Sequence, residues 1–171
     1  MSNGEYRTGQ ESRTKLISGS TFLPKPVTYA VIDGQAVFEG DIILGPADRL
    51  GSADQPQLAS ERASAVVQGI GITGVGFRWP GGVIPFRIDS NLPNQARVTD
   101  AIAHWQQNTF IRFVPRTNEL NFVTFQPGNG CSSWVGMIGG EQAITLAAGC
   151  STGNSIHEIG HAVGLWHEQS R

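Results

Sequence analysis

Three of the chain's four histidines fall within one stretch of eleven residues, His157-Glu158-Ile159-Gly160-His161-Ala162-Val163-Gly164-Leu165-Trp166-His167. Residues four apart share one face of a helix, so His157 and His161 can direct their rings at a single metal ion. Gly164 can take the left-handed conformation that ends a helix, and that turn brings His167 back as a third nitrogen ligand. Three protein ligands leave one coordination position open, which is typical of a catalytic zinc site.

Glu158 follows the first of these histidines and lies close enough to reach a metal-bound water. A carboxylate there can act as the general base that takes a proton from the water and passes it to the leaving amine. Zinc lowers the pKa of its water towards about 7 and polarises the scissile carbonyl of a peptide bond. The stretch therefore predicts a zinc-dependent endopeptidase with one Zn²⁺ per chain.

The competing interpretation is a buried helix whose histidines only complete hydrogen bonds. Clustered histidines with an interposed glutamate are a costly way to build a core. A chance match to the five fixed residues has a probability on the order of 10⁻⁵. The fourth histidine, His104, lies elsewhere, and we expect it to be a structural or surface residue.

Two predicted helices carry or support this site. The first spans residues 91–108, where apolar residues recur at helical spacing. The second spans residues 154–164 and holds the first two histidines, with Asn154 or Ser155 as its expected N-cap.

Short strands are predicted around the helices. Asp33-Gly34 joins two alternating apolar runs, 27–32 and 35–38, and predicts a two-residue hairpin turn. Pro85 favours an edge or irregular strand in its segment. Further strands are expected at 83–88, 110–114, 122–125 and within 136–148. A short helix is expected at 59–67 and a Gly-rich domain boundary at 66–78. The polar residues 1–20 are expected to be a disordered arm.

The composition excludes several classes of protein. The 171 residues carry a net charge of −2 with no basic patch, so we expect no nucleic-acid partner. No apolar stretch reaches 18 residues, so we expect no membrane span. We expect no signal peptide in the polar N-terminus, and the two cysteines, Cys131 and Cys150, could form one disulfide or remain reduced and buried.

The zinc-binding stretch and its continuation Glu168-Gln169-Ser170-Arg171 resemble the astacin family of metzincin proteases. Three further segments resemble that family's catalytic domain: Trp79 to Phe86, Phe110 to Arg116, and Cys131 to Gly136. The resemblance covers about residues 69–171. It implies an α+β fold with a metzincin-like N-terminal subdomain, in which a twisted mixed sheet packs on two helices, one of them the zinc-binding helix. It also implies a secreted or extracellular protein that acts on peptide or protein substrates.

The resemblance extends to the N-terminal segment. Phe38-Glu39-Gly40-Asp41 is similar to a motif of astacin propeptides whose aspartate binds the zinc and keeps the enzyme latent. It implies that Asp41 is a zinc ligand of a proenzyme and that the chain's own propeptide is its inhibitor. The expected domains are a propeptide over 1–68 and a catalytic domain over 69–171. Without the resemblance, Asp41 reads as a turn residue after a hairpin strand.

Further site residues are implied by the family. Ser133, Trp134 and Val135 would bind substrate as an added antiparallel strand, although Trp134 could instead pack in the core. Cys131 and Cys150 would form a disulfide. Glu168 would pair with the new N-terminus, near residue 69 or 70, after activation.

The chain also departs from the family. Phe110 stands where astacins have a cysteine, and we expect the family's C-terminal subdomain, with its Met-containing turn and tyrosine ligand, to be absent. We therefore do not expect these 171 residues alone to hydrolyse peptides, and a separate C-terminal fragment is a partner to consider. The alternative functions are a catalytically silent zinc-binding fragment and a peptide-binding module.

Overall fold

The computed structural model describes residues 8–19, 22–50 and 74–167. Four strands come first: β1 (Glu11–Gly19), β2 (Phe22–Ile32), β3 (Gln35–Phe38) and β4 (Ile42–Pro46). Two short 3₁₀ turns follow, η1 (Val75–Phe77) and η2 (Pro80–Gly82). The remaining elements are β5 (Val83–Ile88), α1 (Ala96–Asn108), β6 (Arg112–Pro115), β7 (Phe122–Gln126), β8 (Cys131–Trp134), β9 (Glu141–Leu146) and α2 (Thr152–Ala162).

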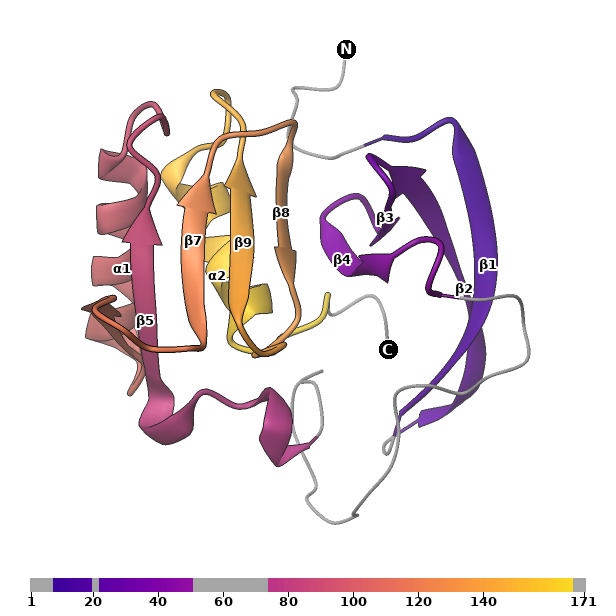
Figure 1. Ribbon diagram of the computed structural model, residues 1–171, viewed down its shortest axis with the longest axis horizontal. Coiled ribbons are helices and arrows are strands. Elements are labelled where there is room, and N and C mark those ends of the chain that lie inside the picture. The colour runs from indigo at the N-terminus through magenta and orange to yellow at the C-terminus, as the bar shows by residue number, and fades with distance from the viewer. Residues whose placement is uncertain (1–7, 20–21, 51–73, 168–171) are drawn as a thin grey trace.

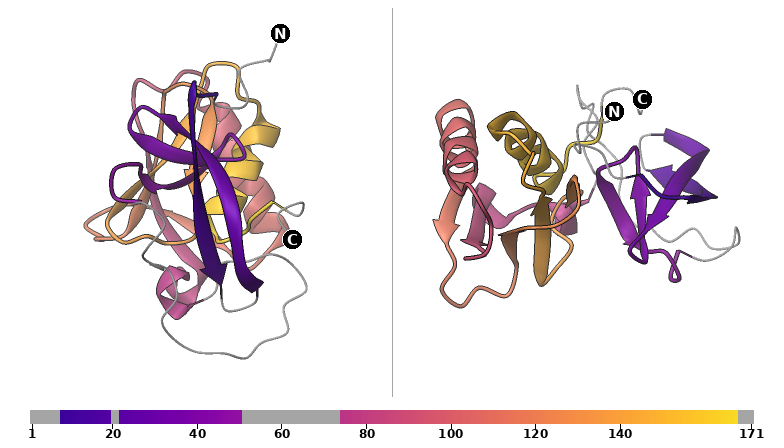
Figure 2. Two further views of the ribbon diagram at one scale, coloured as in Figure 1. Left: turned by 90° about the vertical axis from the view of Figure 1, so that its right-hand side faces the viewer. Right: turned by 90° about the horizontal axis from the view of Figure 1, so that it is seen from above.

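One nine-stranded sheet runs through these residues in the order β1-β2-β3-β4-β8-β9-β7-β5-β6. The first four strands form an antiparallel meander, whereas β5, β6, β7 and β9 pair with one another in parallel. Both helices cover the same face of the sheet's β5–β9 half (Figures 1 and 2). The predicted α+β class, a mixed sheet packed on two helices, is confirmed.

Two hydrophobic clusters hold the layers together. The larger lies between the helices and strands β5–β9 and includes Val98 of α1, Phe125 of β7 and Ile159 of α2, all fully buried. The smaller belongs to the N-terminal strands and is built on Tyr29 and Ala36. The N-terminal strands therefore pack as a unit with their own small core and join the rest through one strand pair, β4 with β8.

Both predicted helices exist, with shifted starts. Helix α1 begins at Ala96 rather than residue 91, because Asn94 has a positive φ of 51° that cannot continue a helix. Helix α2 begins at Thr152, and its N-cap is Ser151, not Asn154 or Ser155. Asn154 instead completes a capping box by accepting a hydrogen bond from the Ser151 backbone, so the N-cap prediction was wrong by three residues.

The disordered arm predicted at the N-terminus is wrong for the residues that form β1. This strand pairs with β2 over most of its length, from Glu11 opposite Val31, whereas residues 1–7 lie outside the described part of the chain. The Thr14 and Thr28 hydroxyls lie 3.1 Å apart across this pair. A polar strand at a sheet edge needs little apolar burial of its own, because backbone pairing with β2 orders it.

The hairpin prediction is confirmed, and of the two alternatives for the strand with Pro85, edge or irregular, the edge strand is wrong. Asp33 and Gly34 have φ of 51° and 74° and form the predicted turn between β2 and β3. Strand β5 lies inside the sheet, but pairing with β7 begins only at Phe86, and Pro85 therefore faces β6 alone.

The helix expected at 59–67 and most of the boundary at 66–78 lie outside the described residues. Among the described residues, no helix has the length and apolar character to cross a membrane.

Candidate metal centre

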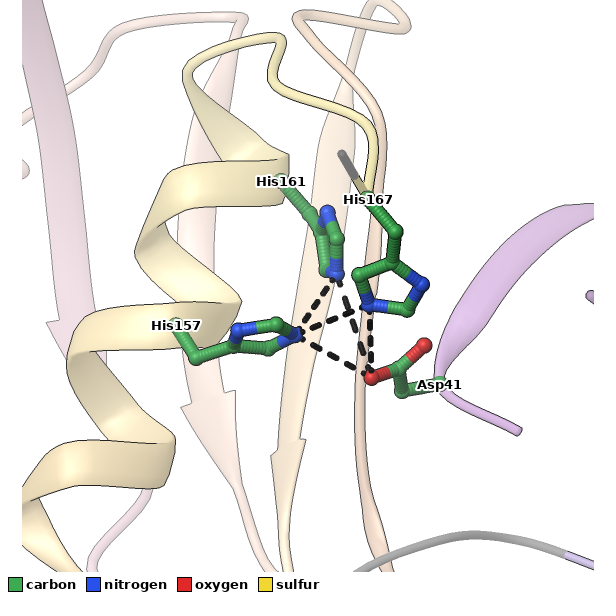
Figure 3. Close-up of side chains that lie close together, drawn as sticks. All are labelled: Asp41, His157, His161 and His167. Atoms are coloured by element: carbon green, nitrogen blue, oxygen red, sulfur yellow. Dashed lines mark hydrogen bonds and ion pairs between the residues drawn. The ribbon is translucent and has the colours of Figure 1, made fainter. Parts of the chain in front are cut away.

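Helix α2 and the turn that follows it bring three histidine rings together. His157 and His161 are one helical turn apart on α2, and their Nε2 atoms lie 3.1 Å from each other. After the helix, Gly164 has a φ of 111°, and its N–H donates to the His161 carbonyl at 2.7 Å. The chain reverses there, and His167 Nε2 arrives 3.0 Å from His157 Nε2, as the spacing predicted (Figure 3).

Asp41 reaches the same point from the N-terminal strands, where it immediately precedes β4. Its Oδ2 lies 3.2 Å from the Nε2 atoms of His157 and His167 and 3.9 Å from that of His161. Asp41 is 1% exposed. The four residues, which we call the histidine–aspartate cluster (Asp41, His157, His161 and His167), keep their ligand atoms within 4.8 Å of one another (Figure 3).

The hydrogen bonds of the Nδ1 atoms, which face away from the cluster, determine which nitrogen of a neutral ring carries the lone pair. His161 Nδ1 lies 2.7 Å from the Leu165 carbonyl, which can only accept, so Nδ1 carries the proton. His167 Nδ1 lies 2.6 Å from Glu39 Oε2 and donates to this carboxylate. When both rings are neutral, as metal binding requires, their Nε2 atoms therefore present lone pairs to the centre of the cluster, beside a carboxylate oxygen. Lone pairs that converge in this way repel one another unless a cation or a proton lies between them.

The separations also fit a metal ion. A tetrahedral zinc site with bonds of about 2.0–2.1 Å has neighbouring ligand atoms about 3.3–3.4 Å apart. Five of the six distances between the cluster's ligand atoms lie between 3.0 and 3.9 Å and bracket that value, and the sixth is within 4.8 Å. Three nitrogens and one carboxylate oxygen are a donor set that suits Zn²⁺. The cluster can therefore hold a metal ion with four protein ligands.

Charge within the cluster shifts two pKa values in the metal-free chain. Burial alone would raise the pKa of Asp41, but the close approach of the His157, His161 and His167 rings outweighs it and holds that pKa far below the usual 3.8. The pKa of His167 is raised above 6.5, chiefly by the Asp41 carboxylate and also by Glu39, against the opposing effect of burial. Without a metal, the pair is therefore stabilised as a carboxylate facing an imidazolium.

Glu158 lies on α2 beside these ligands and is 1% exposed. Its Oε2 has no hydrogen-bond partner among the described residues. Burial, with a smaller contribution from the Asp41 charge, raises the pKa of Glu158 well above its usual range. A buried carboxyl with an unused oxygen is suited to exchange a proton with a molecule that enters the site.

The strand expected to bind substrate already has a partner. Ser133 and Trp134 of β8 pair in parallel with Ile42 and Ile43 of β4, and the Ser133 N–H donates to the Asp41 carbonyl at 3.0 Å. Ser133 and Val135 are buried, while Trp134 is half-buried, so Trp134 is not a residue of the main core. The β8 edge is thus occupied by the segment that carries Asp41.

Covalent and hydrogen-bonded ties hold β8 and α2 in place. Cys131 of β8 and Cys150, next to the N-cap of α2, form a disulfide. Trp79 Nε1 donates to the Ala162 carbonyl at 2.8 Å, and the Gly136 N–H donates to the His161 carbonyl at 2.8 Å. Sequence reasoning gave Trp79 only a place in a family motif and missed this supporting role. An indole N–H, which needs an acceptor when it is buried, could have suggested it.

Other expectations lie away from the cluster or cannot be placed. His104 is exposed on α1 and takes no part in the cluster, as predicted. Glu168 and the expected mature N-terminus near residues 69–70 lie outside the described residues. Glu39, which contacts His167, was quoted only as part of a motif, and no role was predicted for it.

Residues 72–171 match the family model Astacin, which describes a family of peptidases. Blastula protease 10 of Paracentrotus lividus is 43% identical over 104 residues, which cover 55% of this chain and 17% of that protein. Tolloid-like protein 2 of Mus musculus is 44% identical over 98 residues, 54% of this chain and 10% of that protein. Zinc metalloproteinase nas-36 of Brugia malayi is 33% identical over 157 residues, 79% of this chain and 27% of that protein.

A solved structure shares the fold. High choriolytic enzyme 1, a hatching enzyme zinc-protease from Oryzias latipes, superposes with a TM-score of 0.51 at 36% identity, over 55% of this chain and 50% of that one. The chain spans half or less of the length of each of these relatives.

Proposed function

This chain belongs to the astacin family of peptidases, and we propose that it is the latent form of a zinc-dependent endopeptidase. His157, His161 and His167 would hold one Zn²⁺ through their Nε2 atoms. The single observation that carries the proposal is the convergence of these three nitrogens with the Asp41 carboxylate at separations that suit a tetrahedral metal site. Zinc bound there would supply a Lewis acid that activates water and polarises a peptide carbonyl.

Glu158 would carry out the proton transfers of peptide hydrolysis. It is buried in the site, its Oε2 is without a partner among the described residues, and burial raises its pKa well above the usual range. A carboxylate with a raised pKa is a better base for water and, once protonated, can deliver its proton to the leaving amine nitrogen near neutral pH. The substrates would be peptides or proteins, in keeping with the peptidase family.

Asp41 would keep the enzyme latent. It would fill the fourth position of the metal, which catalysis needs for water. The same segment also occupies the β8 edge, where Ser133, Trp134 and Val135 would otherwise receive a peptide as an added strand. Two obstacles, one at the metal and one at the peptide-binding edge, therefore come from the same short stretch around residue 41.

We assign residues 1–68 to a propeptide and residues 69–171 to the catalytic domain. The separate hydrophobic clusters of the N-terminal strands and of the β5–β9 half support this division. The Cys131–Cys150 disulfide supports a secreted or extracellular location, since disulfides persist mainly in oxidising compartments. After cleavage, Glu168 would pair with the new N-terminus.

A peptide-cleavage assay on Asp41→Ala, with the family's C-terminal subdomain added as a separate fragment to every sample, tests the latency. Removal of the carboxylate frees the fourth metal position, so we expect a gain of at least about tenfold in cleavage of a generic peptide over the wild type. Wild type from which a second protease has trimmed the N-terminal segment should gain activity as well. The matched control is Asp48→Ala, which removes an exposed carboxylate of the same segment and should remain latent.

Two outcomes would contradict parts of the proposal. Equal activity in wild type and Asp41→Ala, with activity only after trimming, would remove Asp41 from the latency mechanism. Zinc-loaded protein that stays inactive after trimming would favour a silent zinc-binding fragment or a peptide-binding module.

A further inference from the structure

Glu39 contacts the back of a metal-ligand candidate. Its Oε2 lies 2.6 Å from His167 Nδ1, the ring nitrogen that faces away from the cluster. Glu39 as a whole residue is exposed, yet its side chain is only 26% exposed, because it turns inward towards the 7%-exposed His167. Asp41, two residues later, faces the other nitrogen of the same ring at 3.2 Å. One imidazole is therefore held between two carboxylates of the N-terminal segment.

The backbone at Glu39 is of a kind that glutamate rarely adopts. Glu39 has a φ of 51° and Gly40 a φ of 95°, and the Asp41 N–H donates to the Phe38 carbonyl at 3.4 Å, which closes a tight turn. Turns with two positive φ values favour asparagine, aspartate or glycine at the first central position. Asp33 occupies the equivalent place in the β2–β3 turn with the same φ of 51°. A glutamate that tolerates this conformation is held by the contacts of its side chain.

We propose that Glu39 is a positioning residue of the latent metal site: it accepts the His167 Nδ1 proton and so holds the His167 Nε2 lone pair towards the metal. The proposal rests on the proposed function, because it takes His167 as a zinc ligand. The inhibitory segment then does more than block the metal. It supplies one carboxylate to the metal itself through Asp41 and a second to the metal's third histidine through Glu39.

The neighbouring contacts place this turn firmly against His167. The Phe38 ring packs edge-on against Trp166 with centroids 6.4 Å apart, directly before Glu39 and His167 in their respective segments. The Ser133 N–H donates to the Asp41 carbonyl on the other side of the turn. Departure of the segment would remove Glu39 and Asp41 together. His167 would then lose this acceptor, and zinc should be held less tightly after activation than in the latent chain.

The test measures how fast zinc leaves the chain. Zinc-loaded wild type, Glu39→Ala, Glu39→Gln and Glu39→Gly are mixed with an excess of a chromophoric chelator, and the transfer of zinc is followed by absorbance. Loss of an outer partner of a metal-ligating histidine lowers metal affinity by roughly 10–100-fold. We expect release about tenfold faster from Glu39→Ala, and release within about threefold of wild type from Glu39→Gln, whose amide oxygen can still accept.

Two comparisons separate the carboxylate from the backbone. Glu39→Gly removes both the carboxylate and the conformational strain, and should release zinc as fast as Glu39→Ala. Asp33→Ala removes a carboxylate from a turn residue with the same φ and should behave as wild type. Nitrogen-15 NMR of the histidine rings supplies a readout independent of release rates. The His167 Nδ1 proton resonance should shift in Glu39→Ala and remain in place in Asp33→Ala.

The results distinguish this inference from the function beneath it. If wild type holds zinc but Glu39→Ala releases it at the wild-type rate with an unchanged His167 spectrum, the role of Glu39 is wrong and the zinc site stands. If Glu39→Ala releases zinc quickly but Glu39→Gly releases it at the wild-type rate, the effect comes from backbone strain. That result would also overturn the proposed role of the Glu39 carboxylate. If wild type holds no more zinc than His161→Ala, the proposed function itself fails.

Discussion

Two rings of the histidine–aspartate cluster gain their orientation from different neighbours. His161 donates to a carbonyl of its own following turn, whereas His167 donates to Glu39 of the distant N-terminal segment. The His157 side chain is 43% exposed and marks the open side of the cluster. Local structure thus orients the His161 ring, and the N-terminal segment orients the His167 ring.

At the residue scale, Glu158→Gln should abolish catalysis without loss of metal. In protein activated by trimming, we expect peptide cleavage to fall by roughly 10²–10⁴-fold, because the amide cannot accept the water's proton. Zinc content, measured in the same samples by elemental analysis, should not change, since Glu158 is not among the cluster's ligands. The control Glu141→Gln, an exposed partner of Arg87, should leave cleavage unaltered. Retention of full activity in Glu158→Gln would rule out this base.

The metal-free chain should lose stability as the pH rises. The raised pKa of His167 contributes stability that is complete below its ordinary pKa of 6.5 and is lost as the pH passes the higher folded-state value. The lowered pKa of Asp41 contributes stability above its ordinary 3.8 and is lost only at lower pH. The Tm of chelator-treated protein should therefore fall as the pH rises above about 6.5, and Asp41→Asn should flatten this fall.

The zinc-loaded chain should show the opposite slope. Zinc requires deprotonated ligands, so its stabilising effect grows as the pH rises through the pKa of His167. Thermal melts of both forms over the same pH series would check the pair of predictions. A metal-free Tm that rises with pH would contradict the carboxylate–imidazolium pair.

The convergence of the three histidines, with Glu158 beside them, could be predicted from the sequence because the spacing alone implies proximity. His157 and His161 are adjacent on any helix, and Gly164 permits the reversal that returns His167. The role of Glu39 could not be predicted in this way, because it depends on a turn with two positive φ values and on contact between distant segments. Nothing in local sequence spacing encodes such a contact, although a glutamate directly before a turn glycine is an unusual choice.

At the element scale, the start of α2 depends on a reciprocal cap. The Ser151 Oγ accepts from the Asn154 N–H at 3.2 Å, and the Asn154 side chain accepts from the Ser151 N–H at 2.8 Å. Ser151→Ala should lower the free energy of unfolding by about 1 kcal/mol, as measured by urea denaturation. Thr99→Ala, in an exposed position of α1, should change it by less than about 0.5 kcal/mol. Equal effects of the two substitutions would show that the cap has no special weight.

Element types were easier to predict than element ends or edges. Apolar periodicity located α1, and the histidine spacing with its expected N-cap located α2. Asn154 suits an N-cap and the third helical position alike, and only the hydrogen bonds distinguish them. Strand β1 was missed because its polar residues lack an apolar alternation, and its order comes from β2. The position of Pro85 in an interior strand depended on the stagger of β7, which no local pattern records.

At the scale of the whole molecule, a continuous sheet joins two units that each have a hydrophobic cluster of their own. The N-terminal meander has its own cluster around Tyr29, and its β4 extends the main sheet at β8 (Figure 1). Such an attachment, through one short strand pair and the contacts of the histidine–aspartate cluster, would be reversible if the proposed propeptide were cut. The class of the fold followed from the sequence, but the way in which the meander completes the sheet did not.

The disulfide should stabilise this arrangement, because it ties β8 to the start of α2. Cys131 and Cys150 are separated by 19 residues, and a closed loop of that size contributes about 3 kcal/mol in the chain-entropy model. The double variant Cys131→Ala/Cys150→Ala should lose about that amount of unfolding free energy in urea denaturation. A reductant should destabilise wild type and leave the double variant unchanged. A double variant as stable as wild type would show that the bridge adds nothing to the packed core.

The zinc content of the purified chain tests the central claim most directly. Elemental analysis of wild type, His161→Ala and Asp41→Ala, each dialysed against metal-free buffer after zinc loading, gives the stoichiometry. We predict about one zinc ion per chain in wild type, retention in Asp41→Ala through the three histidines, and near-complete loss in His161→Ala. A wild-type zinc content no higher than that of His161→Ala would contradict the metal site, and with it the proposed endopeptidase.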